Sequence, residues 1–394
     1  MVVDPATRAP AVDVLVILDG ASEPLGDGPT SLERAHTPIL DALATDGELL
    51  RLRTVARGLA AGSESAIPAL LGWVPDGPVD RSAIEAAAHG IEVGDGERAW
   101  RVDRRDRGDA AATARALAER LGARHSTADH RVHHLSRHRM LIVTPAPART
   151  LGAELLGVEL RSGVLRTGLL SAGALGAETP RPGGARDDLF VWPAGALPPR
   201  MLDERTVVIG ARGAAVGIAR LMGAYTVVPP GATGRPGTDL AAKAAAALEA
   251  IEAGATRVVV HVGAPDEAAH EHDGEAKVAA IEAADEQLLG PLAEALRARR
   301  ARPGDGSVTL QVCPDHGCDP ASGRHDDAPV PCLRWPFDRV DDVPAPAGEP
   351  RFEPRFERRR GGRLTERAVA ELAVTEPASV RPPRGRGRGR AVPV

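Results

Sequence analysis

Aromatic side chains and lysine are both scarce in this chain. Its 394 residues include 4 Trp, 1 Tyr and 4 Phe, which argues against functions built on stacked rings, such as single-stranded nucleic-acid binding. Lysine occurs only at Lys243 and Lys277, although Lys and Arg together number 49. Because the chain uses Arg almost everywhere else, the two lysines are candidates for sites that need one compact ammonium group.

Paired cysteines, long apolar runs and a strong net charge are also missing. The three cysteines, Cys313, Cys318 and Cys332, cannot form a fully paired disulfide framework, and no run of about 18 apolar residues predicts a membrane span. A net charge of -5 gives no general attraction to nucleic acid or to an anionic membrane. The first residues lack the basic start and apolar core of a signal peptide. We therefore expect a cytoplasmic protein that binds neither nucleic acid nor membrane; the sequence fixes no oligomeric state.

Alternating strand and helix patterns predict an α/β fold. Short β-branched apolar runs are typical of strands buried on both faces, and helical patterns such as residues 35–50 lie between them. The runs span residues 12–18, 206–209, 257–262 and 308–312. Recurrent β-α-β units of this kind predict a mostly parallel sheet flanked by helices.

A change of composition near residue 77 indicates an inserted domain. Residues 77–205 are rich in Arg, His, Gly and Pro and contain short alternating strands, which predict a smaller α+β domain. The main core would then consist of two parts, residues 1–76 and 206–378. The last segment, residues 379–394, is rich in Arg, Gly and Pro and cannot build a core, so we expect it to be disordered.

Aspartate and histidine follow three of the predicted strands. They are Asp19 after the first strand, Asp266 and His270 after RVVVHV, and Asp315, His316 and His325 after VTLQV. In open parallel sheets, ligands bind beyond the carboxyl ends of the strands. Six such residues at three strand ends therefore predict a metal centre at one edge of the sheet.

The spacing after RVVVHV strengthens this prediction. Pro265 is a natural first residue of a helix, so Asp266 and His270 would stand at positions i and i+4 on one helix face and could grip one ion together. Mixtures of carboxylate and imidazole suit Mn²⁺ and Zn²⁺ best, and Mg²⁺ or Fe²⁺ are further candidates. His261 ends the strand itself, and we expect it in the core or supporting a ligand.

A candidate nucleophile lies in the Gly/Ala-rich turn ARGLAAGSES. Backbone N–H groups and a helix start at such a turn can support an anion. Ser63 is the candidate and Ser65 is its rival, while the alternative for either is a helix N-cap. A serine coordinated by metal ions is activated without a histidine base.

These motifs resemble the cofactor-independent (2,3-bisphosphoglycerate-independent) phosphoglycerate mutases, in their archaeal-type branch of the alkaline phosphatase superfamily. The strongest stretch runs from GIARLMGAYTVVPPGATGRPGTD to HVGAPDEAAHEHDGEAKVAAIEAADEQ. Further matches are ILDG, GSESAIPALLGW and PDHG…RHDDAPVPC. The resemblance covers nearly the whole chain except the basic tail, and it implies an alkaline-phosphatase-like core with an inserted substrate-capping domain.

The resemblance also implies the roles of the site residues. Two divalent metal ions would be bound, and Ser63 would accept a phosphoryl group from the substrate as phosphoserine and return it to a neighbouring hydroxyl, interconverting 3-phosphoglycerate and 2-phosphoglycerate. Metals and cationic side chains would neutralise charge on the phosphoryl oxygens. One ion would be held by Asp266, His270 and His325, and the other by Asp19, Ser63, Asp315 and His316.

The substrate-side positions follow the family less closely. Ile67 and Val216 stand where the family usually has a polar residue and Arg, and such losses would let the intermediate escape to water. Arg81 is retained in DRSAIEA as a phosphate or carboxylate clamp, and Lys243 and Lys277 match lysines of the family, so these three are the expected substrate contacts. Each lysine has an alternative interpretation as a solvated helix residue.

We therefore expect a phosphoglycerate mutase-like metalloenzyme acting on a small anionic phosphorylated substrate. The alternative within the same site is a phosphatase or phosphotransferase for another phosphorylated or phosphonate metabolite. A non-catalytic metal-binding relative is the alternative of another class.

The inserted segment contains a cluster of histidines, namely His125, His130, His133, His134 and His138. We interpret them as scattered surface residues or, alternatively, as a site for an anion or a metal ion.

Overall fold

The computed structural model describes most of the chain with four larger gaps. The described residues are 10–104, 115, 118–119, 131–136, 139–145, 189–192, 194–302, 306–336 and 359–376. The expected tail at 379–394 therefore lies outside the described residues, as do His125, His130 and His138. Of the histidine cluster, His133 and His134 are described, on a strand.

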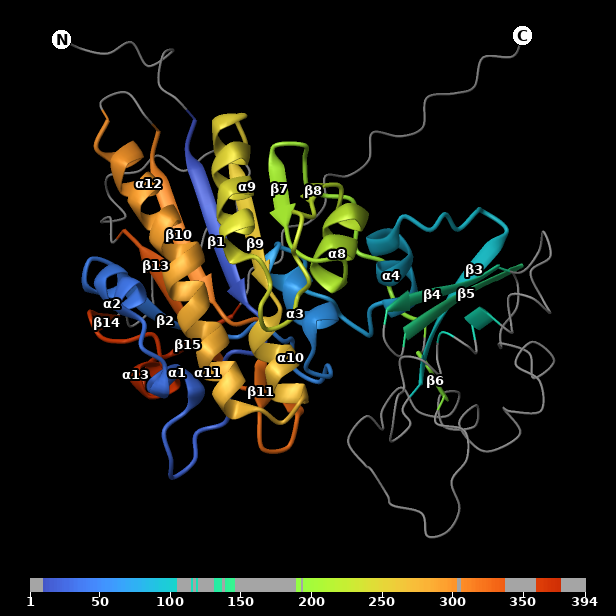
Figure 1. Cartoon of the computed structure of the whole chain (residues 1–394), viewed down its shortest axis with the longest axis horizontal. Coiled ribbons are helices and arrows are strands. Elements are labelled where there is room, and N and C mark those ends of the chain that lie inside the picture. Colours follow the sequence, from blue (N-terminus) through green and yellow to red (C-terminus); the bar gives the residue numbers. More distant parts are fainter. Residues whose placement is uncertain are drawn as a thin grey trace.

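A large, mostly parallel sheet forms the core of the molecule (Figure 1). Five neighbouring strands run parallel, in the order β10 (Val308–Cys313), β1 (Val12–Leu18), β9 (Arg257–Val262), β7 (Thr206–Ile209) and β8 (Tyr225–Val227). Beyond β10 lie the antiparallel β13 (Val330–Trp335), β2 (Glu48–Leu52) and β14 (Arg359–Arg360), with β15 (Val374–Thr375) parallel to β2. The predicted α/β class with a mostly parallel sheet is confirmed.

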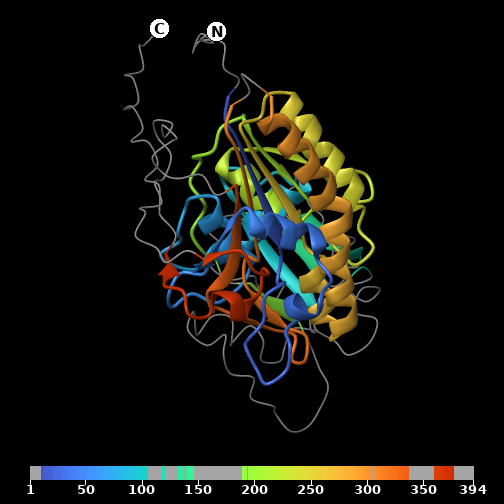
Figure 2. The same ribbon diagram turned by 90° about the vertical axis from the view of Figure 1, so that its left-hand side faces the viewer.

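The central strand β1 is apolar on both faces because helices cover both sides of the sheet. Val14 and Val16 pack into one core cluster, and the alternating residues Leu15 and Ile17 pack into the other. The first cluster joins the sheet to α2 (Pro38–Thr45), α9 (Leu240–Glu252), α11 (Gly274–Ala283) and α12 (Gly290–Arg300), with a π-helical turn at Ala284–Leu289 (Figure 2). The second cluster joins it to α3 (Ser63–Leu70), α8 (Ala214–Met222) and α4 (Arg81–His89).

The expected helix over residues 35–50 is wrong beyond Thr45. Helix α2 ends there, and β2 begins at Glu48. Gly47 makes the bend, because a Cβ at this position would lie 2.7 Å from the carbonyl oxygen of Arg334. Leu49 then pairs with Leu333 of β13. The chain therefore leaves the helix because strand pairing and a close backbone approach outweigh local helix propensity.

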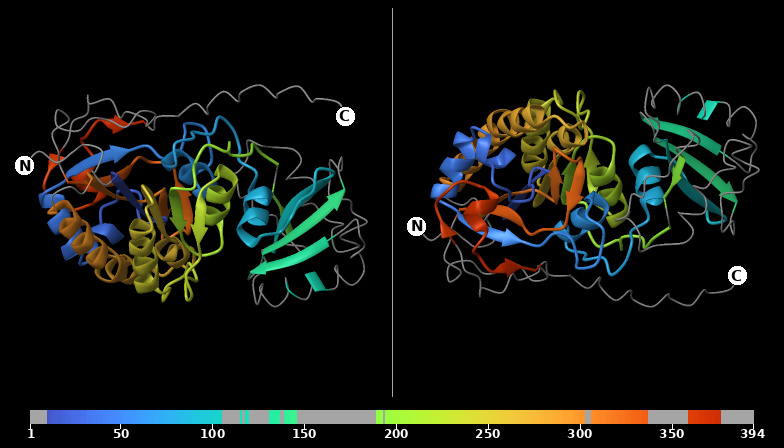
Figure 3. Two further views of the ribbon diagram at one scale, coloured as in Figure 1. Left: turned by 90° about the horizontal axis from the view of Figure 1, so that it is seen from above. Right: turned by 90° about the horizontal axis from the view of Figure 1, so that it is seen from below.

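A second, antiparallel sheet lies apart from the main sheet, with α4 between the two (Figure 3). Its strand order is β4 (Arg131–Ser136), β5 (Arg139–Pro145), β3 (Glu97–Arg104) and β6 (Leu189–Val191). All four strands fall within residues 77–205, but α4 of the same segment packs tightly on α8, where Gly217 approaches the carbonyl of Ile84. The boundaries of the inserted domain stay a prediction.

Five small elements complete the surroundings of the site. They are α10 (Ala264–His270), which follows β9, the hairpin of β11 (Gly317–Asp319) and β12 (Arg324–Asp326), which follows β10, and the short helices α1 (Ser31–Arg34) and α13 (Glu366–Val369). Across the described part of the chain, no helix has the length and apolar character needed to cross a membrane.

Candidate metal centre

Three adjacent parallel strands deliver the predicted residues to one edge of the sheet. Asp19 follows β1, Asp266 lies in the first turn of α10 just after β9, and Asp315 follows β10. Because β9, β1 and β10 are direct neighbours with the same direction, their carboxyl ends meet. The structure thus brings all six predicted Asp and His residues together, in two overlapping groups.

The first group, which we call the outer group, consists of Asp266, His270, Cys318 and His325, whose ligand atoms all lie within 4.8 Å of one another. The Nδ1 atoms of His270 and His325 lie 3.0 Å and 3.2 Å from the carbonyl oxygens of Gly323 and Ala61. A carbonyl only accepts, so each Nδ1 carries the proton and each Nε2 presents a lone pair.

Those two Nε2 atoms are only 2.9 Å apart. Asp266 adds its carboxylate oxygens at 3.3 Å from His270 and 3.2 Å from His325. Lone pairs directed at one another without a proton between them repel, and a cation placed among them removes this repulsion. The i, i+4 spacing of Asp266 and His270 on α10 therefore gives the arrangement expected of two ligands of one ion.

The second group, which we call the inner group, contains Asp19, Asp266 and His316, with Asp315 beside them. Asp266 thus belongs to both groups. His316 is fully buried, its Nδ1 lies 3.1 Å from the carbonyl of Gly317, and its Nε2 has no hydrogen bond although Asp19 Oδ1 lies 3.4 Å away. Like the two outer histidines, it turns a lone pair toward the carboxylates, and in His316 this lone pair is buried.

Asp315 is oriented by backbone donors on one side only. Its Oδ1 accepts from the N–H groups of Gly20 at 3.1 Å and His316 at 3.0 Å. Its Oδ2 is buried and has no hydrogen bond. A buried carboxylate oxygen without a donor is costly, so this atom is a natural ligand for a cation.

The carboxylates of the two groups crowd one another. Burial raises the pKa of Asp19 well above its ordinary value, and the nearby charges of Asp315 and Asp266 raise it further. For Asp266, burial is outweighed by its contacts with the imidazoles of His270 and His325, so its pKa lies well below the ordinary value. Carboxylate oxygens, imidazole nitrogens and one thiol form a donor set that fits divalent metal ions.

Gly20 makes this close approach possible. Its φ of 60° lies in the left-handed region, which a glycine adopts at little cost. A Cβ at this position would lie 2.5 Å from Asp266 Oδ1. Any larger residue would therefore push the shared carboxylate out of both groups.

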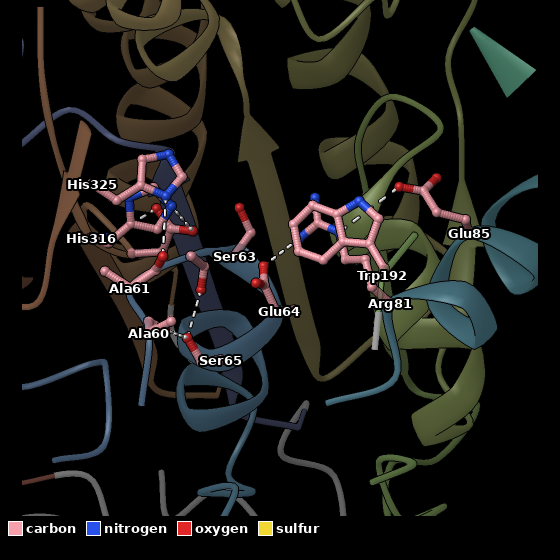
Figure 4. Close-up of polar contacts among 12 residues, drawn as sticks. Ala60, Ala61, Ser63, Glu64, Ser65, Arg81, Glu85, Trp192, His316 and His325 are labelled. Carbon is pink, nitrogen blue, oxygen red and sulfur yellow. Dashed lines mark hydrogen bonds and ion pairs between the residues drawn. The ribbon is translucent and has the colours of Figure 1, made fainter. Parts of the chain in front are cut away.

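Ser63 and Ser65 have different surroundings, as Figure 4 shows. Ser63 is the first residue of α3, and its Oγ lies 3.5 Å from Asp19 Oδ1. Ser65 Oγ lies 2.8 Å from the carbonyl of Ala60 and 2.9 Å from that of Gly62, so its hydroxyl proton is used within the turn. Of the two candidates, only Ser63 faces the carboxylates of the inner group.

Arg81 lies beside α3 and already has an anionic partner (Figure 4). Its guanidinium contacts the carboxylate of Glu64, the neighbour of Ser63, and stands over the ring of Trp192 at 5.3 Å. Its Nε is buried without a hydrogen bond. Behind it, Arg101 joins Glu85 at 2.7 Å and Asp103 at 2.8 Å in a buried ion-pair network.

The two lysines lie behind the site, and neither is exposed. Lys243 donates to the carbonyl of His261 at 2.8 Å, and Lys277 donates to the carbonyls of Cys318 at 2.6 Å and Ser22 at 3.2 Å. Neither is therefore a solvated helix residue. Lys277 also pairs with Glu23 at 3.3 Å. Both buried ammonium groups are thus bonded within the protein and support the strands and loops that hold the site, and their expected contact with the substrate stays a prediction.

Two site residues lie outside the predicted set. His261, expected in the core or supporting a ligand, places Nε2 3.0 Å from Asp19 Oδ2, and burial lowers its pKa to about 4. Cys318 belongs to the outer group. Its position two residues after His316 was the available signal, but a single cysteine without a partner spacing does not identify a ligand.

Comparison with known proteins identifies the family of this chain. Residues 12–341 match the profile of a family described as the metalloenzyme superfamily. A 2,3-bisphosphoglycerate-independent phosphoglycerate mutase 2 of Methanothermobacter thermautotrophicus is 32% identical over 362 residues, which cover 81% of this chain and 87% of that protein. The chain belongs to the metalloenzyme superfamily, among the cofactor-independent phosphoglycerate mutases. The resemblance that its motifs indicated is confirmed.

Further relatives support the same assignment. The 2,3-bisphosphoglycerate-independent phosphoglycerate mutase of Methanosarcina barkeri is 28% identical, with 81% of this chain and 88% of that protein covered. A solved protein from Pyrococcus horikoshii has the same fold, with a TM-score of 0.64 at 22% identity over 83% of this chain and 87% of that one. This phosphoglycerate mutase-like metalloenzyme binds divalent metal ions, and the outer and inner groups are the described residues that could hold them.

Proposed function

We propose that the chain interconverts 3-phosphoglycerate and 2-phosphoglycerate through a phosphoserine at Ser63, with two divalent ions in place. Mn²⁺ and Zn²⁺ suit the donors best, and Mg²⁺ is a further candidate. The observation that carries this proposal is the position of Ser63, at a helix start and 3.5 Å from Asp19 in the metal-binding cluster. The outer ion would be held by Asp266, His270 and His325, and the inner ion by Asp19, Ser63, Asp315 and His316.

The residues divide the reaction between them. Divalent ions supply charge neutralisation and make a coordinated hydroxyl a better nucleophile. Ser63 Oγ loses its proton and attacks the phosphorus of the substrate; the bond between phosphorus and the substrate oxygen breaks, that oxygen takes up a proton, and the serine is phosphorylated. The neighbouring hydroxyl of the glycerate then loses its proton and attacks the phosphoserine, and Ser63 Oγ leaves and is protonated again. Asp19 orients Oγ before the first attack, because it is the acceptor within reach of the hydroxyl.

The inserted segment, residues 77–205, is proposed to cap the substrate. Arg139 of the second sheet reaches 3.6 Å from Glu267, which is the residue after Asp266. Arg81 on α4 contacts Glu64, the residue after Ser63. Cationic groups of this segment therefore lie next to residues that neighbour the metal-binding ones, and each is paired with a carboxylate. Arg81 is the proposed clamp: the phosphate or carboxylate of a small phosphorylated anion would take the place of Glu64 at its guanidinium.

Two apolar positions favour a second function at the same site, in which the phosphoserine is hydrolysed or its phosphoryl group goes to another acceptor. Ile67 is 1% exposed and packs with Leu15 and Ile17, and Val216 is fully buried. Neither position can hold the glycerate by a polar contact while the phosphoserine waits. If the intermediate leaves, water attacks the phosphoserine, and the enzyme acts as a phosphatase or as a phosphotransferase on another phosphorylated or phosphonate metabolite.

Phosphorus NMR distinguishes these outcomes. The purified chain with Mn²⁺ is given 3-phosphoglycerate, and the products are followed over time. Formation of 2-phosphoglycerate supports the mutase, and free phosphate without 2-phosphoglycerate supports the phosphatase. Absence of turnover on this compound and on a panel of phosphate esters would contradict the proposal.

Ser63→Ala and Ser65→Ala form a matched pair of variants. Both remove one hydroxyl from the same turn, but only Ser63 faces Asp19. We expect Ser63→Ala to lose turnover and to take up no phosphate label, and Ser65→Ala to keep both. Full activity of Ser63→Ala would refute the nucleophile assignment.

A further inference from the structure

Cys318 occupies a ligand position that the proposed metal sites do not use. It lies on β11, directly opposite His325 of β12 in the hairpin register, and it is fully buried. Its Sγ is within 4.8 Å of the ligand atoms of Asp266, His270 and His325. The outer group therefore offers four donors: one carboxylate oxygen, two imidazole nitrogens and one sulfur.

The backbone of Cys318 is held firmly on both sides. Its N–H donates to the carbonyl of Ser22 at 2.8 Å. Its own carbonyl accepts from Lys277 Nζ at 2.6 Å, and this ammonium is fully buried. The main chain of Cys318 is thus held beside the outer group, with its side chain opposite His325. Burial and the neighbouring Asp266 raise the pKa of the thiol, so its proton leaves only as a metal–sulfur bond forms.

We propose that Cys318 is the fourth ligand of the outer ion and makes this site selective for Zn²⁺ over Mn²⁺ and Mg²⁺. Four donors of the types N, N, O and S are typical of tetrahedral Zn²⁺, and a thiolate favours soft and borderline ions over hard ones. As the metal–sulfur bond forms, the S–H bond breaks and its proton passes to solvent. This inference rests on the outer metal site of the proposed function.

The competing role for Cys318 is a protonated thiol that donates a hydrogen bond to Asp266. In that case sulfur never bonds to the ion, three ligands remain, and nothing in the outer group disfavours Mn²⁺. The inner group offers mainly carboxylate oxygens and one imidazole. It therefore suits harder ions whether Cys318 binds the outer ion or donates a hydrogen bond to Asp266. The two roles therefore differ in one measurable property, a bond between sulfur and the outer ion.

Co²⁺ reports this bond directly because a thiolate–Co²⁺ bond absorbs strongly in the near ultraviolet, whereas carboxylate and imidazole ligands do not. The metal-free full-length protein is titrated with Co²⁺ and its absorption is recorded. We expect a sulfur charge-transfer band that grows to one equivalent and is abolished by added Zn²⁺. In Cys318→Ala the band should be absent, and the affinity of the outer site for Co²⁺ should be lower by at least about tenfold. Mutation of a residue that only hydrogen-bonds to a metal ligand already lowers metal affinity by about that factor, and loss of a ligand should cost no less.

Cys332→Ala is the matched control. Cys332 is also a buried cysteine, but it lies on β13 outside both donor groups, so its removal should leave the band intact. Co²⁺ bound to the wild-type protein without a sulfur band, or a band that persists in folded Cys318→Ala, would overturn the assignment of Cys318 and leave the proposed function standing. Failure of the wild-type protein to bind Co²⁺ at all would overturn both. The wild-type spectrum decides the question even if Cys318→Ala does not fold.

Discussion

Replacement of Lys243 by Met tests the cost of burying a charge behind the active site. Lys243 is fully buried on α9, and its ammonium donates one hydrogen bond, to the carbonyl of His261. Methionine has a similar length and volume, so packing changes little. The substitution therefore removes the charge and that hydrogen bond while keeping the core filled.

The expected gain in stability follows from the pKa. Burial lowers the pKa of Lys243 to about 8, whereas an unfolded lysine titrates near ~10.4. At roughly 1.4 kcal/mol for each pKa unit, keeping the buried group charged costs about 3 kcal/mol at neutral pH. The lost hydrogen bond offsets about 1 kcal/mol of this. Lys243→Met should therefore raise the free energy of unfolding at pH 7 by about 2 kcal/mol.

The difference in unfolding free energy between the wild type and Lys243→Met should change with pH in a definite direction. Between pH 8 and pH 10.4 the unfolded chain keeps a proton on Lys243 that the folded chain releases. Stability of the wild-type protein relative to Lys243→Met therefore rises with pH in this window, because the penalty present below pH 8 is lost. Near the upper end, the variant should lose its advantage and fall about 1 kcal/mol below the wild type.

Urea denaturation of both metal-free proteins at several values between pH 7 and pH 10 measures this difference. The reasoning is refuted if Lys243→Met is less stable at pH 7, or if the difference between the two proteins stays constant across the window. Steady-state kinetics on the same variant tests the sequence prediction of a substrate contact. A buried supporting role leaves KM for the phosphorylated substrate nearly unchanged, whereas loss of a direct contact raises it.

Other predictions concern the metal centre and its support. Ser65→Ala should lower the free energy of unfolding by about 1 kcal/mol in urea while turnover persists. Lys277→Met should destabilise the protein by several kcal/mol, about 1–3 for each acceptor left unpaired (the carbonyls of Cys318 and Ser22 and the carboxylate of Glu23), and it should weaken metal binding measured by calorimetry. Mn²⁺ at about a thousandfold over Kd should stabilise the fold by ~4 kcal/mol in thermal scans, with reversal by a chelator. His270→Ala, at the exposed edge of the outer group, should lower metal affinity without unfolding the chain.

Much of the metal centre could be predicted because its residues follow strands. A buried parallel strand is recognisable from its β-branched run, and polar residues after such runs must meet at one edge of the sheet. Asp19, Asp266 and Asp315 were placed in this way, and the structure brings them together. The helical spacing of His270 from Asp266 is equally local and gave the correct face of α10.

Local patterns failed where distant segments decide the outcome. The helix predicted over residues 35–50 stops at Thr45 because β13, far along the chain, offers a strand partner from Glu48 onward. Cys318 became a ligand candidate only when the hairpin β11–β12 placed it opposite His325. The two lysines stood out by their rarity, but rarity did not show that both ammonium groups are buried.

The sequence by itself determined the fold class, the family and the strand ends that carry Asp and His, because hydrophobic periodicity and motif spacing are local properties of a chain. Only the tertiary structure decided that Asp266 is shared between two donor groups, that Ser63 and not Ser65 faces them, and that a thiol joins the outer group. These facts depend on atoms hundreds of residues apart meeting within a few ångströms. Such distances are set by the packing of the whole core, and short-range sequence patterns carry no information about that packing.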